Sequence, residues 1–423
     1  MNTILVIVFG LTYLAIASEH FLKISKSASA LLGAGILWSL YAVMATDANC
    51  VTKELSHSLI STSHIVFFLI GAMAIVEVID AHHGFEVVTR HIKTHRLVSL
   101  LWQLSVVTFF LSAILDNLAT TIVMVSVVKK LVRREDDRLF LAGFVVIAAN
   151  AGGAWSPMGD VTTTMLWIGG QITPRATIET LFFPSLVSLI VPLMVGSWMI
   201  RGRQLTAIDS AEKSPSIATE LERNIVFFLG LSVLLFVPFF KTLTQLPPFM
   251  GVFLGLGLVW FVGDVLHRRK SVLAQEHLGL TAAFSRIDMP SIMFLLGILL
   301  SVATLEHTHI LSNLSEWINQ VIHRQEVVVL LIGLASAIVD NVPLVAASMS
   351  MYDKAIYPID SFFWQFLAYC AGTGGSILVI GSAAGIAAMG IAKINFAWYL
   401  RKISGLALLG YLAGASVFLL RAS

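Results

Sequence analysis

Residues 150–164 read NAGGAWSPMGDVTTT and interrupt an apolar stretch that covers about 139–170. Three glycines and a proline are poor residues for the interior of a helix. At membrane depth, irregular backbone persists only against protein or a water-filled cavity, where its carbonyl and amide groups can coordinate an ion. Asp160 falls at the expected N-cap of a second helix that starts with three threonines. The stretch therefore predicts a membrane helix that is broken at a functional site.

A second broken stretch covers about 361–392, with Gly372-Thr373-Gly374-Gly375-Ser376 and Gly381-Ser382 at its centre. The glycines in both stretches allow another interpretation, the close packing of neighbouring membrane helices. The Ser, Thr, Asn and Asp residues gathered around them favour the ion-coordinating interpretation.

The composition places the whole chain in a membrane. Of 423 residues, 57% are hydrophobic and 12% charged, whereas a soluble domain is about half apolar and about a quarter charged. These values indicate an all-α polytopic membrane protein and exclude a soluble enzyme. The net charge of +2 gives no sign of nucleic-acid binding, and two distant cysteines predict neither a disulfide framework nor a metal cluster. We expect no cofactor.

Apolar segments predict about ten transmembrane spans. They lie at about 3–17, 28–45, 64–81, 139–170, 181–200, 224–240, 249–266, 290–305, 361–392 and 403–420. Two further apolar stretches, 97–128 and 327–352, are interrupted by Asp116-Asn117 and Asp340-Asn341, pairs that favour turns and helix caps. We expect each to form a re-entrant hairpin, and the two hairpins to open to opposite faces.

The basic residues orient this map. With alternating spans, 21 of the 27 Lys and Arg residues, Lys26 among them, fall on one face. That face is cytoplasmic by the positive-inside rule, so we expect both termini outside.

A hexapeptide repeat divides the chain. SAILDN at 112–117 recurs as SAIVDN at 336–341, and the glycines of the first broken stretch match those of the second at nearly the same offset. We expect a first repeat over 1–205, a cytoplasmic linker over 206–223 and a second repeat over 224–423. Each repeat has an odd number of crossings, so the second is inverted. Inverted repeats with broken helices are typical of secondary transporters.

Three aspartates carry the strongest functional signal. Asp116, Asp160 and Asp340 are expected at mid-membrane, where an ionisable residue is costly and indicates function. For the two hairpin aspartates, capping of the turn is the alternative role. Because no basic residue is expected in the membrane core, the site favours a hard cation such as Na⁺ or Li⁺. Neutral oxygens are expected from Asn117, Thr120, Ser156, Thr162, Thr163, Asn341, Ser376 and Ser382.

Four further polar residues lie at the cytoplasmic end of the third span. Glu77 and Asp80 share one helix face and are followed by His82 and His83. They predict a proton entrance or a pH sensor, because histidine titrates near neutrality. A solvated helix end is the alternative.

The segments ILDNLATTIVM, AANAGGAWSPMGDVTTTMLWIGG, SAIVDNVP and GTGGSILVIGSAAG resemble the NhaD-type sodium/proton antiporters of the ion transporter superfamily. The resemblance covers essentially the whole chain. It implies Na⁺(Li⁺)/H⁺ exchange in a bacterial inner membrane, a homodimer surrounded by lipid and an elevator-like motion. It also adds Thr121 to the ion-binding residues.

Two other functions are open on the sequence alone. Arsenite exporters are also similar, so a metalloid or anion exporter on the same fold is one alternative. An intramembrane aspartyl protease that uses two of the aspartates is a remote one.

Overall fold

The computed structural model describes residues 2–17, 19, 23–45, 47–89, 94, 96–204, 218–268, 270–271, 277–338 and 340–422. Most of the predicted linker, residues 206–217, lies outside this part of the chain. Over the described residues, nine helices are long and apolar enough to cross a membrane, or up to ten if a bent pair counts as one span. An all-helical polytopic membrane protein is therefore confirmed.

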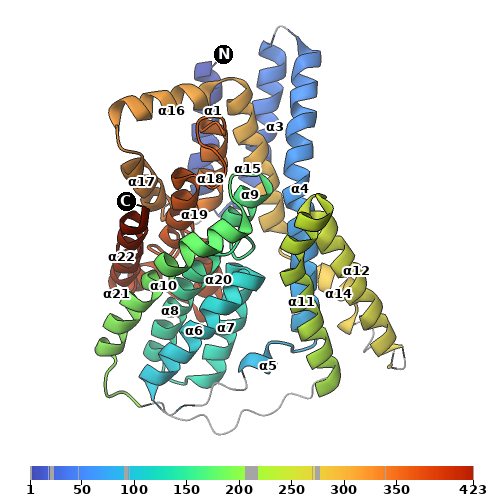
Figure 1. Ribbon diagram of the computed structural model, residues 1–423, viewed down its shortest axis with the longest axis vertical. Helices are drawn as coiled ribbons and strands as arrows, with labels where there is room; N and C mark the ends of the chain where they lie inside the picture. The colour runs from blue at the N-terminus through green and yellow to red at the C-terminus, as the bar shows by residue number, and fades with distance from the viewer. Residues whose placement is uncertain are drawn as a thin grey trace.

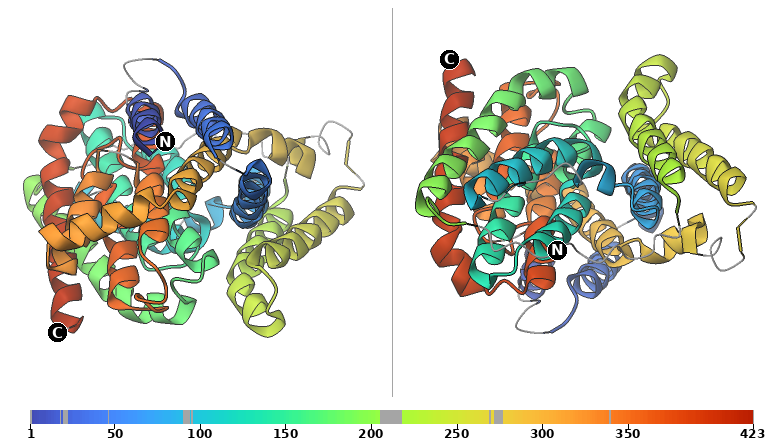
Figure 2. Two further views of the ribbon diagram at one scale, coloured as in Figure 1. Left: turned by 90° about the horizontal axis from the view of Figure 1, so that it is seen from above. Right: turned by 90° about the horizontal axis from the view of Figure 1, so that it is seen from below.

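One group of helices, the long-helix bundle, surrounds the longest helix, α4 (Figure 1). In Figure 2, α11 and α12 lie on the opposite side of the molecule from α22. The helices of this bundle are α1 (Asn2–Ala17), α3 (Lys26–Met44), α4 (Ala48–Ala81), α11 (Glu220–Thr244), α12 (Pro248–His267), α14 (Leu280–Arg286) and α15 (Met289–His307).

The broken-helix bundle holds the two interrupted stretches and the helices that pack on them. Within it, α6 packs on α8, α17 on α19, and α10 on α22. Its helices are α6 (Leu97–Leu115), α7 (Asn117–Leu131), α8 (Glu135–Ala154), α9 (Val161–Ile168), α10 (Pro174–Met199), α17 (Gln325–Ser336), α18 (Asn341–Met351), α19 (Phe362–Gly374), α20 (Ala383–Ala392), α21 (Phe396–Lys402) and α22 (Ser404–Ala422). The bent pair is α20 and α21, which meet at 112°. Two short helices, α5 (Glu86–Thr89) and α16 (Ile310–Val321), connect the bundles, and α16 lies across the top of Figure 1.

Helix breaks occur near each segment that contains predicted site residues. Helices α6 and α7 meet at Asp116, and α17 and α18 flank Asp340. Residues 155–160 separate α8 from α9, and residues 375–382 separate α19 from α20. How these hairpins sit relative to a membrane, and the inverted repeat itself, stay predictions.

Glycines in the broken stretches let backbones cross closely. A Cβ atom on Gly152 of α8 would collide with the backbone of Phe109 on α6, and one on Gly374 of α19 would collide with the backbone of Gly333 on α17. A Cβ atom on Gly153 or Gly375 would likewise collide with the backbone of the loop that follows, at Gly159 or Gly381. Close packing, the second interpretation of these glycines, therefore explains why they are needed.

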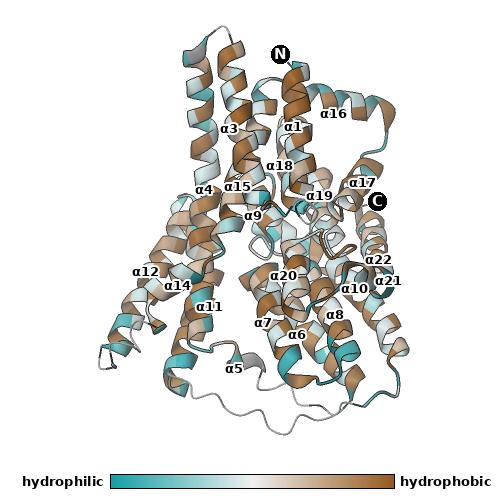
Figure 3. Ribbon diagram, turned by 180° about the vertical axis from the view of Figure 1, so that it is seen from behind, coloured by the Kyte–Doolittle hydropathy of each residue, from teal (hydrophilic) through white to brown (hydrophobic). Residues whose placement is uncertain are grey.

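Some predicted boundaries were wrong. Helix α4 begins at Ala48 and has 34 residues, whereas the sequence predicts a span only from about 64. Residues 48–63 are too polar to resemble a span, but they contain no glycine or proline, and Asp47 caps the helix by accepting from the Asn49 N–H. Figure 3 shows this upper part of α4 in pale and teal colours. Helix α10 begins at Pro174 instead of about 181.

Candidate functional site

Four helix N-termini carry the polar residues that the sequence singles out. Asp116 caps α7, Asp160 caps α9, Asp340 caps α18 and Ser382 caps α20, each accepting a hydrogen bond from a backbone N–H in the first turn of its helix. The N-terminus of a helix carries partial positive charge, which stabilises a carboxylate there. Three acids and one hydroxyl thus occupy equivalent places on four helices.

A cavity of about 60 Å³ lies between the two bundles and brings the three aspartates together. This volume has room for an ion with a few waters. The residues that line it from the broken-helix bundle are Asp116, Asn117, Leu118, Asp160, Val161, Asp340, Asn341, Val342 and Ala383. The long-helix bundle contributes Lys26, Leu69, Met73, Ser291, Ile292, Phe294 and Leu295.

Asp160 is the centre of the hydrogen-bond network. Its side chain is buried, and its Oδ2 accepts from Asn117 Nδ2 at 3.0 Å and from Asn341 Nδ2 at 3.2 Å. Its Oδ1 accepts from the backbone N–H of Thr162 at 3.1 Å. One carboxylate therefore connects both Asp-Asn turns to the first helix break.

Asn150 extends this network to the second helix break. Its Nδ2 donates to Ser376 Oγ at 3.0 Å and to Ser382 Oγ at 2.9 Å, and its Oδ1 accepts from Asn117. Asn150 was not among the predicted site residues. The sequence could have indicated it, since Asn150 stands two residues before Gly152 of the first break.

The predicted hydroxyl groups differ in their surroundings. Thr120 and Thr121 are buried on α7, and their hydroxyls have no hydrogen-bond partner within the described residues. Thr163 donates to the backbone carbonyl of Asp160, and Ser156 accepts from the Met158 N–H. Thr163 and Ser156 therefore support the local turns of the first break.

Lys26 lines the same cavity as the three aspartates, whereas the sequence assigned no basic residue to their site. Its Nζ lies 2.7 Å from Asp340 Oδ2 and 4.5 Å from the centre of the Phe294 ring. The sequence placed Lys26 on the cytoplasmic flank of a span. In the structure α1 and α3 occupy the upper half of the view in Figure 3, so the start of α3 lies at mid-height, against α15.

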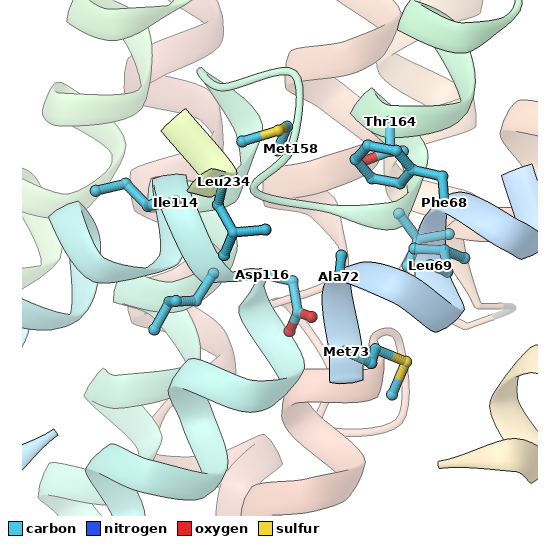
Figure 4. Close-up of a pocket in the computed structure, with 11 residues that line it drawn as sticks. Phe68, Leu69, Ala72, Met73, Ile114, Asp116, Met158, Thr164 and Leu234 are labelled. Atoms are coloured by element: carbon cyan, nitrogen blue, oxygen red, sulfur yellow. The ribbon is translucent and has the colours of Figure 1, made fainter. Parts of the chain in front are cut away.

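Asp116 has different surroundings. Figure 4 shows its carboxylate beside Ala72 and Met73 of α4, and no described residue forms an ion pair with it. Its backbone, at φ 124° and ψ 163°, has a conformation that almost only glycine adopts. Such strain costs about 1–3 kcal/mol and concentrates at functional sites.

The three carboxylates share a cavity without forming one chelate. Within the described residues, no group of three or more His, Cys, Asp or Glu side chains is arranged to hold a metal ion. Carboxylate and amide oxygens are among the donors that this cavity offers, and such hard oxygen ligands suit a hard cation.

The four residues of the predicted proton entrance differ in exposure. On α4, Asp80 is exposed and Glu77 is half-buried, while His83 lies beyond the helix, exposed and 3.9 Å from Glu86. His82 is fully buried, and its Nε2 lies 2.9 Å from Nε2 of His267 on α12. The sequence did not predict this partner, because His267 is 185 positions away.

The sequence profile of the citrate transporter family matches residues 13–364. The chain belongs to this family. Sodium/proton antiporter 1 of Arabidopsis thaliana is 49% identical over 98% of this chain and 71% of its own length. The Na⁺/H⁺ antiporter NhaD of Alkalimonas amylolytica is 30% identical over 97% of this chain and 89% of its own length. The resemblance to NhaD-type antiporters is therefore confirmed.

A solved structure has a similar fold. The YdaH transporter of Alcanivorax borkumensis superposes with a TM-score of 0.57 over 93% of this chain and 95% of its own, at 10% sequence identity. The chain is thus a multi-pass membrane transporter of the citrate transporter family and not an enzyme, so the aspartyl protease alternative is wrong.

Proposed function

We propose that this member of the citrate transporter family exchanges Na⁺, and also Li⁺, for H⁺, and that these cations compete for Asp116, Asp160 and Asp340. The observation that carries the proposal is the cavity between the bundles, which holds all three carboxylates and one ammonium. Even with Lys26 counted, ionised carboxylates leave the cavity with a negative charge, which attracts cations. Relatives named sodium/proton antiporters support the same ion pair.

In this proposal Asp160 holds the central ion. Asn117 and Asn341 donate to its Oδ2 and so occupy the place that a cation would take. An amide group that rotates by half a turn presents its carbonyl oxygen in nearly the same volume. Both asparagines would then change from donors to the carboxylate into ligands of Na⁺. The hydroxyls of Ser376 and Ser382 would support this arrangement indirectly, through their hydrogen bonds with Asn150.

Protons would reach the cavity along α4. One face of that helix carries Asp80, Glu77 and Met73, which are three and four residues apart. Met73 lines the cavity together with Asp116. Glu77 lies close enough to Asp116 for their charges to interact. The pH-sensing role of the histidines is proposed for His82, whose buried ring shares a hydrogen bond with His267.

Alternating access would come from movement of the broken-helix bundle against the long-helix bundle. Two inverted repeats, 1–205 and 224–423, would relate the inward-facing and outward-facing states. We propose a homodimer in lipid, as the resemblance implies. The bacterial inner membrane and the external termini stay predictions, and one of the relatives compared is a plant protein.

Two observations favour an anion substrate: the family is named for citrate transport, and the ammonium of Lys26 lies in the cavity. This charge is already neutralised by Asp340 at 2.7 Å. Asp116 and Asp160 would repel an arsenite or carboxylate anion that came near. The cation is therefore the better substrate for this geometry.

The test uses purified protein in liposomes that have an acidic interior and contain a pH-sensitive dye. Addition of NaCl or LiCl at alkaline external pH should dissipate the pH gradient, and KCl serves as the comparison. Since H⁺ and Na⁺ compete for carboxylates, the apparent KM for Na⁺ should rise as the pH falls. Absence of a Na⁺ response, with the protein present, would overturn the proposal. Uptake of arsenite or citrate in its place would support an anion transporter.

A further inference from the structure

We infer that the ammonium of Lys26 is a tethered competitor of Na⁺ for the carboxylate of Asp340, and that it sets the apparent Na⁺ affinity of the transporter. This inference rests on the proposed Na⁺/H⁺ exchange and adds a specificity-determining residue to it.

The ion pair belongs to the cavity itself. Lys26 Nζ and Asp340 Oδ2 are 2.7 Å apart, and their side chains are 16% and 10% exposed. Both residues line the same cavity as Asp116 and Asp160. A cation that binds Oδ2 of Asp340 therefore competes with this ammonium.

The two partners come from different bundles. Lys26 opens α3 of the long-helix bundle, and Asp340 caps α18 of the broken-helix bundle. The N-terminus of α3 repels a positive charge because of the helix dipole. The ammonium is therefore held by what faces it, namely Asp340 and the Phe294 ring at 4.5 Å.

A displaced ammonium has other carboxylates nearby. Glu19 and Asp288 both lie within electrostatic range of Lys26, and Glu19 Oε1 accepts the Lys26 backbone N–H at 3.0 Å. The flexible four-carbon stem of lysine allows the ammonium to move between such partners. Release from Asp340 therefore leaves the ammonium stabilised.

Competition follows from the similarity of the two cations. The lysine ammonium and Na⁺ are both compact, strongly hydrated and monovalent. A tethered group acts at a high effective concentration, so free Na⁺ must exceed it to occupy Asp340. Asp116 and Asp160 have no such competitor within the described residues.

The experiment measures the apparent KM for Na⁺ at one alkaline pH, in liposomes, for wild type and three variants. Lys26→Gln removes the competing charge and should lower this KM by roughly two- to fivefold, the scale of a partly exposed ion pair. Lys26→Arg should raise it, because a guanidinium binds a carboxylate more tightly, in two places. Lys241→Gln is the control, since Lys241 is half-buried against Trp167 and does not line the cavity.

Repeating Lys26→Gln in an Asp340→Asn variant separates loss of competition from a change in the packing of the cavity. Lys26→Gln should leave the Na⁺ KM unchanged there, because the one carboxylate with which Lys26 is paired has been removed. If Lys26→Gln does not accumulate in the membrane, the direction of the Lys26→Arg shift decides.

An unchanged or higher KM in Lys26→Gln, or an unchanged or lower one in Lys26→Arg, would overturn the inference while wild-type exchange upholds the proposed function. If wild type shows no Na⁺ response, the proposed function fails first.

Discussion

The two Asp-Asn turns share five of six residues, yet the structure gives their aspartates different partners. Asp340 is paired with Lys26 at 2.7 Å, whereas the carboxylate of Asp116 lies beside Ala72 and Met73 of α4. The difference arises in the long-helix bundle, which places α3 opposite one turn and α4 opposite the other. Similar motifs can therefore have different partners when asymmetric neighbours cover them.

The two helix breaks differ in the same way. Asp160 caps α9 and Ser382 caps α20, at equivalent places in the two stretches. Both Asp-Asn turns donate to Asp160, so this single acid serves both halves of the site. The centre of the cavity is therefore less symmetric than the repeat.

Asp160→Asn should have the largest effect on exchange. The substitution keeps the size of the side chain and its capping ability but removes the charge that accepts from Asn117 and Asn341. We expect Na⁺/H⁺ exchange to fall roughly a hundredfold, the scale of a buried hydrogen bond to a charged group. Liposome assays on equal amounts of folded protein measure this loss, and activity near wild type would contradict the central role of Asp160.

Asp116→Asn tests the unpaired turn and should have a smaller effect. Asparagine is as good an N-cap as aspartate, so α7 should form as before. The lost carboxylate should reduce exchange by roughly tenfold, because one of three cation ligands in the cavity loses its charge. Thermal melting in detergent serves as the control for folding. An equal loss of exchange and of thermal stability would mean that the aspartate only caps the turn.

Gly152→Ala and Gly374→Ala test whether the two helix crossings are equivalent. In each variant the new Cβ meets backbone, at Phe109 or at Gly333, so the helices must move apart. We expect each to lower stability by about 1–3 kcal/mol, as overpacking does. Gly257→Ala on α12 is the matched control, because a Cβ there has open space. A loss of stability in only one of the two variants would show that the two helix crossings are not equivalent.

Ser382→Ala should have the smallest effect. It removes the α20 cap, in which Ser382 Oγ accepts from the Gly385 N–H, and also one partner of Asn150. We expect a loss of about 1 kcal/mol in stability, typical of a lost N-cap, with exchange reduced only slightly. Ser382→Thr keeps a capping hydroxyl and should melt close to wild type. A loss of exchange as large as in Asp160→Asn would make Ser382 an essential ligand.

The local pattern was sufficient for much of the fold. The apolar runs predicted the membrane helices, because length and hydropathy are properties of a segment by itself. Asp160 was expected at the start of a helix, and Asp116 and Asp340 at the turns of hairpins; each one caps a helix. The predicted helix boundaries were wrong where a helix contains polar residues. Residues 48–63 of α4 are helical although they are too polar to resemble a span.

Contacts between side chains that are far apart in the sequence could not be predicted from it. The sequence assigned Lys26 to the cytoplasmic face, and only the packing of both α3 and α18 against α15 brings its ammonium to Asp340, 314 positions away. His267 beside His82 and Asn150 beside Ser376 are further cases. Composition and local spacing determined that this chain crosses a membrane and breaks its helices at three acids. Tertiary structure alone decided which acid is already paired, because an ion pair depends on distance in space and not on distance along the chain.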